Sequence, residues 1–251
     1  GINGHGYNLT IGKDFLFDEH GYYGLLFDYG SNTVSGAAGS GEYDSYSLGL
    51  YAGNKNKPGS ITGFVSYGLQ ANKGTAYLPV LGQTAESGYD SKTLGIGVEY
   101  AYDLDYGKPE ELWHVSPYAR LNFTHYRQKA FREHGAGVFD RSFGSYSDNY
   151  AEGELGLSFD RSEGTGGYGI RLGYKRILAG ERQLMEVCFA EDECGSLLPV
   201  RSWGEGRNHF VAAAYVRHDF SRKWSAGGSL SGDWSNGGRE IGARLDLAYH
   251  F

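Results

Sequence analysis

The sequence is poor in several features that mark other classes of protein. It has only 1 Met, 5 Pro and 2 Cys in 251 residues, and no stretch approaches the ~20 consecutive apolar residues that a transmembrane helix needs. Its formal net charge is −7, so the basic surface typical of nucleic-acid-binding proteins is missing and no nucleic-acid partner is expected. Two cysteines are too few for a structural zinc site, and no glycine-rich run is followed by the Lys of a phosphate-binding loop. We therefore expect no metal and no other cofactor.

The start of the chain also lacks a familiar signal. Residues 1–5 have neither the basic segment nor the apolar core of a signal peptide. We expect either that a signal has been removed or that the chain is part of a longer precursor. Cys188 and Cys194 lie close together in an acidic, irregular segment. A small disulfide loop between them would suit an oxidising, extracytoplasmic location, and two unpaired thiols are the alternative.

Glycine and aromatic residues are abundant. The chain has 41 Gly, 21 Tyr, 13 Phe and 4 Trp. Glycine at this level without a collagen repeat, together with so many aromatic residues, argues against both a collagen and a disordered chain. The length suits one domain over residues 1–251, because β-barrels of this size often form a single unit.

The dominant pattern is strict alternation of apolar and polar residues, which indicates strands with two unlike faces. It is clearest at the end of the chain, where one face carries Ile241, Ala243, Leu245, Leu247, Tyr249 and Phe251 and the other carries Glu240, Arg244, Asp246 and His250. Similar rows precede it, for example over residues 7–15, 23–29, 46–52, 94–104 and 168–174. We count about eleven such segments. Several are longer than the five or six residues usual for a soluble strand.

A soluble β-sandwich would show the same periodicity, but three further features favour a membrane barrel. Aromatic residues lie at the ends of the apolar rows, and the polar face mixes both signs of charge with Gly and Ser. Short connections (18–20, 54–59, 161–166, 221–223) alternate with longer ones (31–41, 75–91, 132–149, 179–207). The mean hydropathy of −0.47 is compatible with this, because alternating faces average to hydrophilic. We predict an all-β, antiparallel up-and-down transmembrane barrel in outer-membrane lipid, with long connections extracellular and the C-terminus periplasmic.

Four segments and the chain end resemble the translocator barrel of autotransporters, the type V secretion proteins of Gram-negative outer membranes. The likeness is carried by residues 9–14, 46–52, 95–100 and 115–121, and by the last strand, residues 244–251. The resemblance implies a twelve-strand barrel and an upstream pore helix that threads it and leads to a secreted passenger segment. It also implies that Leu245, Leu247, Tyr249 and Phe251 form a C-terminal signal read by the outer-membrane barrel assembly machinery. The chain departs from the family in its count of eleven strands and in the absence of the helix. We expect either that a first strand precedes Gly1 or that the count merges two strands into one.

Charged residues on the polar face are the candidate functional residues. In a barrel they would line the lumen, where they must pair or stay hydrated. They could hold the pore helix, brace the barrel and set ion selectivity, or they could be hydrated filling with no individual role. They are Asp14, Asp28, Glu99, Arg120, Glu152, Glu154, Arg171, Lys175, Arg217, Asp219, Asp233, Arg244 and Asp246.

The predicted function is a membrane anchor and translocation pore for a passenger. One alternative is a stand-alone barrel that acts as a small porin or as a surface adhesin through its outer loops. A rim hydrolase is another, since one predicted outer loop holds His134, Asp140, Ser142 and Asp148. Their spacing does not demand a catalytic arrangement, so we do not expect an enzyme.

Overall fold

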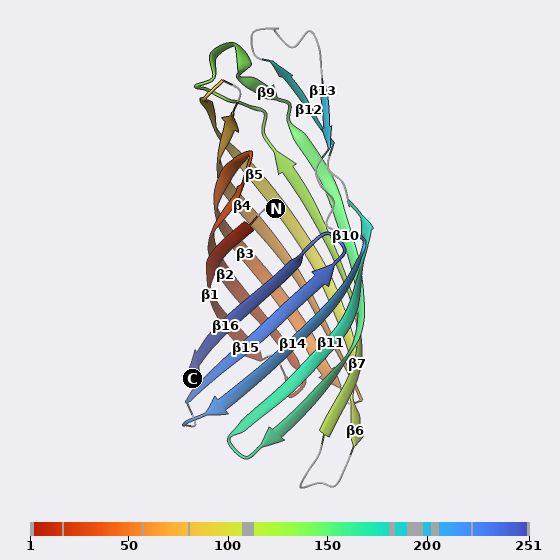
Figure 1. The fold of residues 1–251 in the computed structure, drawn as a ribbon. Helices are drawn as coiled ribbons and strands as arrows, with labels where there is room; N and C mark the ends of the chain where they lie inside the picture. The colour runs from red at the N-terminus through yellow and green to blue at the C-terminus, as the bar shows by residue number, and fades with distance from the viewer. Residues whose placement is uncertain are drawn as a thin grey trace.

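The chain forms one long antiparallel sheet that curls into a half-barrel (Figure 1). The computed structural model describes residues 3–16, 18–56, 58–79, 81–106, 113–180, 184–189, 198–201, 206–221 and 223–249. Eleven strands follow one another in sheet order: β1 (Asn3–Leu16), β2 (Gly21–Gly36), β3 (Gly39–Asn56), β4 (Gly59–Leu78), β5 (Gln83–Tyr102), β7 (Trp113–Gln128), β10 (Tyr146–Glu163), β11 (Gly166–Ala179), β14 (Asn208–Asp219), β15 (Trp224–Ser235) and β16 (Arg239–Tyr249). The short strand β6 (Leu104–Tyr106) continues β5 alongside β7. The predicted all-β, up-and-down fold is confirmed.

The burial pattern is inverted relative to a soluble protein. Large apolar side chains lie on the outside of the sheet, with Leu245 91%, Ile241 72% and Leu48 66% exposed. Apolar surface of this extent is rare on soluble monomers and marks a surface that is covered by lipid or by a partner. Within the described part of the chain, no helix is long and apolar enough to cross a membrane. The exposed apolar side chains of the sheet form a surface suited to a bilayer, as alternation predicted.

Short turns join the strands at one end of the sheet, called here the short-turn end. Between β1 and β2, Asp18 accepts hydrogen bonds from the backbone N–H of His20 at 2.7 Å and of Gly21 at 2.5 Å. Between β14 and β15, Ser221 accepts from the backbone N–H of Lys223 and Trp224. These side chains satisfy backbone donors that the ladder leaves free, which is why Asp and Ser suit these positions.

The opposite end, called here the long-hairpin end, differs from the sequence prediction. Residues 31–41 and 75–91 were expected as long connections, but they are mostly strand: β2 and β3 pair up to Gly36 and Gly39, and β4 and β5 pair up to Leu78 and Gln83. The strands β4 and β5 each have 20 residues, roughly twice the 9–11 that a tilted strand needs to cross a bilayer. Backbone hydrogen bonds continue beyond the apolar rows, because the ladder does not require an apolar face.

A second, small sheet lies beyond this end (Figure 1). Its strand order is β13 (Leu198–Arg201), β12 (Leu184–Phe189), β9 (Arg141–Phe143), β8 (Phe131–Arg132), and a short 3₁₀ turn, η2 (Gly137–Phe139), precedes β9. Phe131 stacks between Tyr89 of β5 and Phe143 of β9, with ring centroids 4.2 and 4.4 Å apart. We call this the outer sheet. The connections expected over residues 132–149 and 179–207 thus contain ordered strands.

The curled sheet has an open side between its first and last strands. Among the described residues, β1 pairs only with β2 and β16 pairs only with β15. Both edge strands are exposed along almost their whole length. With eleven strands alternating in direction, β1 and β16 run the same way and cannot close the sheet as an antiparallel pair.

Candidate functional site: the inner face of the sheet

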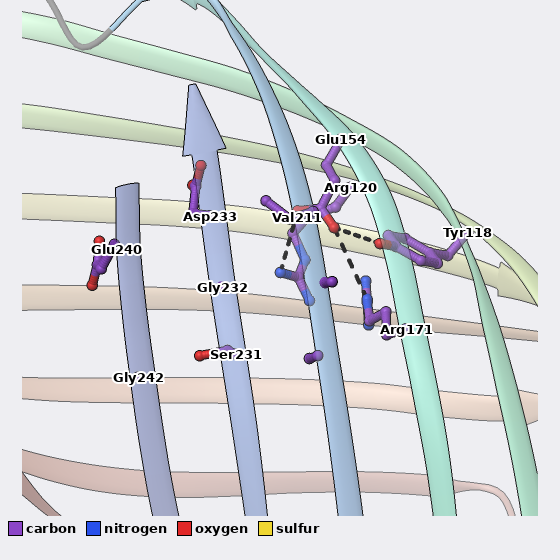
Figure 2. Close-up of a pocket in the computed structure, with 12 residues that line it drawn as sticks. Tyr118, Arg120, Glu154, Arg171, Val211, Ser231, Gly232, Asp233, Glu240 and Gly242 are labelled. Carbon is purple, nitrogen blue, oxygen red and sulfur yellow. Dashed lines mark hydrogen bonds and ion pairs between the residues drawn. The ribbon is translucent and has the colours of Figure 1, made fainter. Parts of the chain in front are cut away.

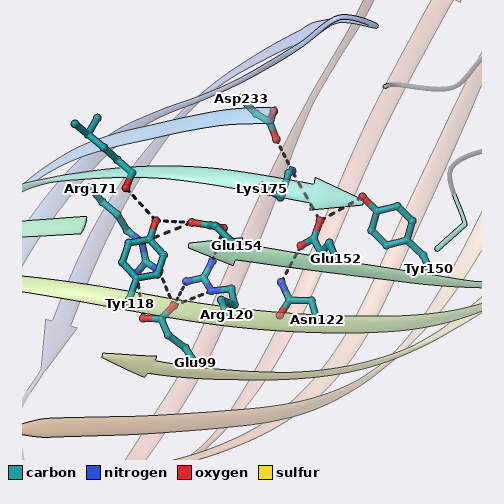
Figure 3. A network of polar contacts seen from close by, with 11 residues as sticks. Glu99, Tyr118, Arg120, Asn122, Tyr150, Glu152, Glu154, Arg171, Lys175 and Asp233 are labelled. Carbon is teal, nitrogen blue, oxygen red and sulfur yellow. Dashed lines mark hydrogen bonds and ion pairs between the residues drawn. The ribbon is translucent and has the colours of Figure 1, made fainter. Parts of the chain in front are cut away.

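Charged side chains from strands that are not neighbours meet on the concave side of the sheet. Arg171 of β11 lies 2.6 Å from Glu99 of β5, although β7 and β10 separate these strands. Side chains so far apart in strand order can meet only where the sheet curves inward, so this side is the inner face. Figure 3 shows the connected set, called here the inner polar network, whose members are Glu99, Tyr118, Arg120, Asn122, Tyr150, Glu152, Glu154, Arg171, Lys175 and Asp233.

Tyr118 is the most enclosed member of this network. It is 5% exposed, and its hydroxyl donates to Glu154 at 2.5 Å. The guanidinium of Arg171 lies 3.5 Å from the centre of the Tyr118 ring. A side chain at Gly173 would place its Cβ 2.5 Å from the Tyr118 oxygen. Glycine at this position therefore leaves the space in which the ring and its cation pack.

Arg120 joins the two carboxylates of this half of the network. It contacts Glu99 at 2.6 Å and Glu154 at 3.8 Å. Because Arg171 binds Glu99 as well, two guanidinium groups hold one carboxylate in a forked arrangement. All three charges are part-buried, so each needs the others to offset its loss of hydration.

A second half of the network lies toward the long-hairpin end. Lys175 of β11 pairs with Asp233 of β15 and lies 3.9 Å from Glu152. Asp233 also contacts the ring Nδ1 of His209 at 2.6 Å, and His209 is 4% exposed. Asn122 donates to Glu152 at 2.8 Å. This group spans β7 to β15 and ties five consecutive strands of the sheet together.

The other predicted lumen residues lie outside this network. Asp28 accepts hydrogen bonds from Thr10 at 2.5 Å and from Asn8 at 3.3 Å, and Asp14 accepts one from Tyr51. Two further pairs form between residues two apart on one strand, Arg217 with Asp219 and Arg244 with Asp246. The inner face is thus uneven: β5 to β15 carry the charged network, whereas β1 and β2 hold two carboxylates that meet neutral donors.

A hollow opens beside the network toward β14, β15 and β16 (Figure 2). Its volume is about 260 Å³, and its lining includes Tyr118, Glu154, Arg171, Asp233 and Glu240. Both signs of charge border it, so it suits water or a polar segment better than an apolar ligand. Among the described residues no cluster of His, Cys, Asp and Glu is arranged to hold a metal ion.

The residues considered for a hydrolase have other contacts. Asp140 accepts a hydrogen bond from the backbone N–H of Ala136 at 2.8 Å, and Asp148 accepts one from the Tyr146 hydroxyl at 2.7 Å. The backbone of His134 pairs with that of Glu86. None of the hydrogen bonds found in the described chain joins His134 to Asp140, Ser142 or Asp148.

Two groups of predicted residues are described only in part. Cys188 is buried in the outer sheet and is disulfide-bonded, but Cys194 lies outside the described residues, so their pairing stays a prediction. Of the C-terminal signal, Leu245 and Leu247 face outward and are 91% and 67% exposed, and Tyr249 packs against Trp224. Phe251 also lies outside the described residues.

Sequence reasoning missed two tyrosines of the network and a histidine that contacts it. Tyr118, Tyr150 and His209 make close contacts, yet they were not among the candidates because only charged residues were chosen. Parity along the strand was the available signal: Tyr118 is two residues from Arg120, and Tyr150 is two residues from Glu152. Both therefore had to share a face with a candidate.

The chain matches the family model described as the autotransporter beta-domain over residues 1–231. A search of curated protein sequences found no match. Among solved structures, the translocator domain of the autotransporter NalP from Neisseria meningitidis is similar, with 18% identity and a TM-score of 0.82 over 100% of this chain and 81% of that one. The beta domain of the Bordetella autotransporter BrkA is also similar, with 15% identity and a TM-score of 0.66 over 100% of this chain and 92% of that one.

These structural likenesses show a shared fold. The family match over residues 1–231 covers every member of the inner polar network except Asp233. An outward apolar surface, an inner polar face and a curled antiparallel sheet are what such a barrel requires. The chain therefore belongs to the autotransporter beta-domain family, whose outer-membrane barrel anchors the protein and carries a linked passenger segment to the cell surface.

Proposed function

We propose that this sheet is the greater part of a translocation pore, and that one further strand, upstream in the precursor, completes it. The open side supports this proposal. The edges β1 and β16 run in the same direction, so a single strand running the opposite way is antiparallel to both. In lipid, an unpaired edge would leave backbone N–H and C=O groups unsatisfied at a cost of several kcal/mol each. Closure by one strand removes both edges and gives an even strand count.

The inner face then lines the pore through which a passenger passes, with an upstream helix as the occupant of the finished barrel. The charged network on β5 to β15 holds its members to one another and so keeps that wall open and rigid. Asp14 and Asp28, on the other wall, meet only neutral donors in the described contacts. Basic groups of the helix are the partners that these carboxylates suit.

In the proposed orientation the long-hairpin end is extracellular and the short-turn end, with the C-terminus, is periplasmic. Outer-membrane barrels have short periplasmic turns and longer outer loops, which fits the two ends of this sheet. The outward row Leu245, Leu247 and Tyr249, with Phe251 after it, is the surface we assign to the assembly machinery and then to lipid. Catalysis has no part in this proposal.

Surface labelling in the native cell tests this function. A short epitope placed in the β4–β5 turn at Gly82 should be labelled on intact cells, whereas one placed at Glu19 should be labelled only after the outer membrane is opened. Added protease should remove the passenger from intact cells that make the full-length protein. It should not do so when β16 is deleted, because the barrel then fails to assemble. Surface passenger without β16 would contradict the proposal.

The stand-alone adhesin remains the second candidate, favoured by the outer sheet. Glu133, 4% exposed, binds Arg141 through two contacts of 2.6 Å, so this sheet is an ordered platform. Surface binding after removal of the passenger distinguishes the adhesin from the translocator. An adhesin would keep its binding to a surface when the passenger is removed, and a translocator would lose it.

A further inference from the structure

Two basic residues lie directly opposite each other on the outward face of the sheet. In the β5–β7 register, Lys92 pairs with Arg127. Like charges in this position repel, because opposite side chains have Cβ atoms about 5 Å apart. In the registers of the described strands no other two Lys or Arg residues are opposed, and the one Lys–His pair, Lys175 with His209, shares the carboxylate of Asp233. Elsewhere the sheet sets opposite charges against each other, as with Glu42 and Lys73.

The neighbourhood does not neutralise this pair. On the same face, the closest carboxylate is Asp90, which already binds Lys129 at 2.7 Å. With Lys92, Arg127 and Lys129 against Asp90, two net positive charges remain. The strands on either side place Leu69 opposite Lys92 and Ser147 opposite Arg127, and neither adds negative charge. Both basic side chains are exposed.

The pair lies at the upper edge of the outward apolar surface. One row below it, Leu94 is opposite His125, and below that Ile96 is opposite Phe123. Leu94, Ile96 and Phe123 are 38%, 49% and 40% exposed and face outward with the rest of the apolar rows. In the orientation proposed above, on which this inference rests, that edge is the level of the outer-leaflet headgroups.

We propose that Lys92 and Arg127 together bind a phosphate group of an anionic lipid in the outer leaflet. A phosphate between them would turn their repulsion into two charge-assisted contacts, one of which can be the forked contact that a guanidinium makes. Lysine and arginine near a membrane edge keep their charge in the headgroup region while their stems follow the apolar surface. His125, held to Asn149 at 2.9 Å, lies one row deeper and borders the same site.

The test is a titration of the full-length protein, purified in zwitterionic detergent, with bisphosphorylated lipid A. We expect the double variant Lys92→Gln/Arg127→Gln to bind about thirtyfold more weakly than the natural protein, the effect of two basic groups at an anionic surface. The matched control is Lys73→Gln, an outward lysine one strand away whose opposite neighbour is Glu42. It should bind as the natural protein does. The charge-keeping variant Lys92→Arg/Arg127→Lys should retain most of the binding, and gel mobility before and after heating shows that each variant is folded.

Three results would overturn the site: unchanged affinity in the double variant, an equal loss in Lys73→Gln, or equally tight binding of dephosphorylated lipid A. If soluble pyrophosphate competed at the same concentration as lipid A, the assignment of the bound phosphate to a lipid would be wrong. The orientation is tested separately by the Gly82 epitope. If that epitope is reached only from the periplasm, the orientation and the outer-leaflet assignment fail, whereas the titration alone decides whether Lys92 and Arg127 bind phosphate.

Discussion

Arg171 on β11 reaches Glu99 on β5 across two intervening strands, and the two side chains lie 2.6 Å apart. This contact depends on the curvature of the sheet, since a flat sheet would hold the two residues more than 10 Å apart at about 4.8 Å per strand. The contact is therefore a direct indicator of how strongly the sheet curves between β5 and β11.

We predict that Arg171→Ala destabilises the folded barrel by about 1–3 kcal/mol, because a part-buried carboxylate loses one of its two charged partners. Glu99 would keep only Arg120, and Tyr118 would lose the cation above its ring. The measurement is the temperature at which the folded band disappears on a semi-native gel. In Arg244→Ala the lost pair is exposed, 70% and 43% for its two side chains, so the change should stay below about 1 kcal/mol. Equal effects of the two variants would contradict a bracing role for the network.

We predict that Gly173→Ala lowers stability by about 1–3 kcal/mol, because the added methyl group overpacks a filled site. Its Cβ would lie 2.5 Å from the Tyr118 oxygen and 2.9 Å from both Glu154 and Val211. Gly63→Ala is the matched change on an outward position, where the nearest atom is 3.6 Å away. The same gel assay should show no loss for Gly63→Ala, and a loss there as large as at Gly173 would rule out the packing argument.

The Asp18 turn should show a defined pH dependence. Hydrogen bonds from the backbone N–H of His20 and Gly21 lower the pKa of the Asp18 carboxyl below its ordinary value. A lowered pKa in the folded state means that the turn is stabilised above the ordinary Asp pKa and loses this stabilisation as the pH falls through the lowered value. The carboxyl carbon shift of Asp18, followed by NMR in detergent, should titrate below the range of a free Asp, and an ordinary midpoint would contradict the contact. The difference in unfolding temperature between the natural protein and Asp18→Asn should shrink over the same interval.

The outer sheet should be open to destabilisation by mutation while the barrel stays folded. In Glu133→Ala, Arg141 loses a two-point partner that is almost fully buried. We expect faster cleavage by added protease within residues 129–145 on intact cells, and an unchanged heat-dependent shift of the barrel band. If Glu133→Ala also lowered the temperature at which the barrel band shifts, the outer sheet and the barrel would unfold as one unit.

The strands and their faces were predictable, because alternation over residues such as 94–104 and 241–249 assigns each side chain to one side of a sheet. The full lengths of the strands were not predictable, because residues 31–41 and 75–91 are mostly strand but lack the apolar row that marks a strand in the sequence. The partners within the network could not be predicted either. That Arg171 meets Glu99 depends on register and curvature, which no local pattern encodes. Parity along β14 puts His209 on the polar face, but its contact with Asp233 depends on how β14 and β15 pack in the folded sheet.

We propose that this barrel belongs to a longer protein whose upstream part supplies a strand, a pore helix and a passenger. The most direct measurement is the intact mass and N-terminal sequence of the outer-membrane species that carries this C-terminus in its native cell. We predict a precursor, or a cleaved remnant, that extends upstream of Gly1 through a helix and one further strand. A mature outer-membrane chain that begins at or near Gly1, with only a signal peptide removed, would contradict the claim.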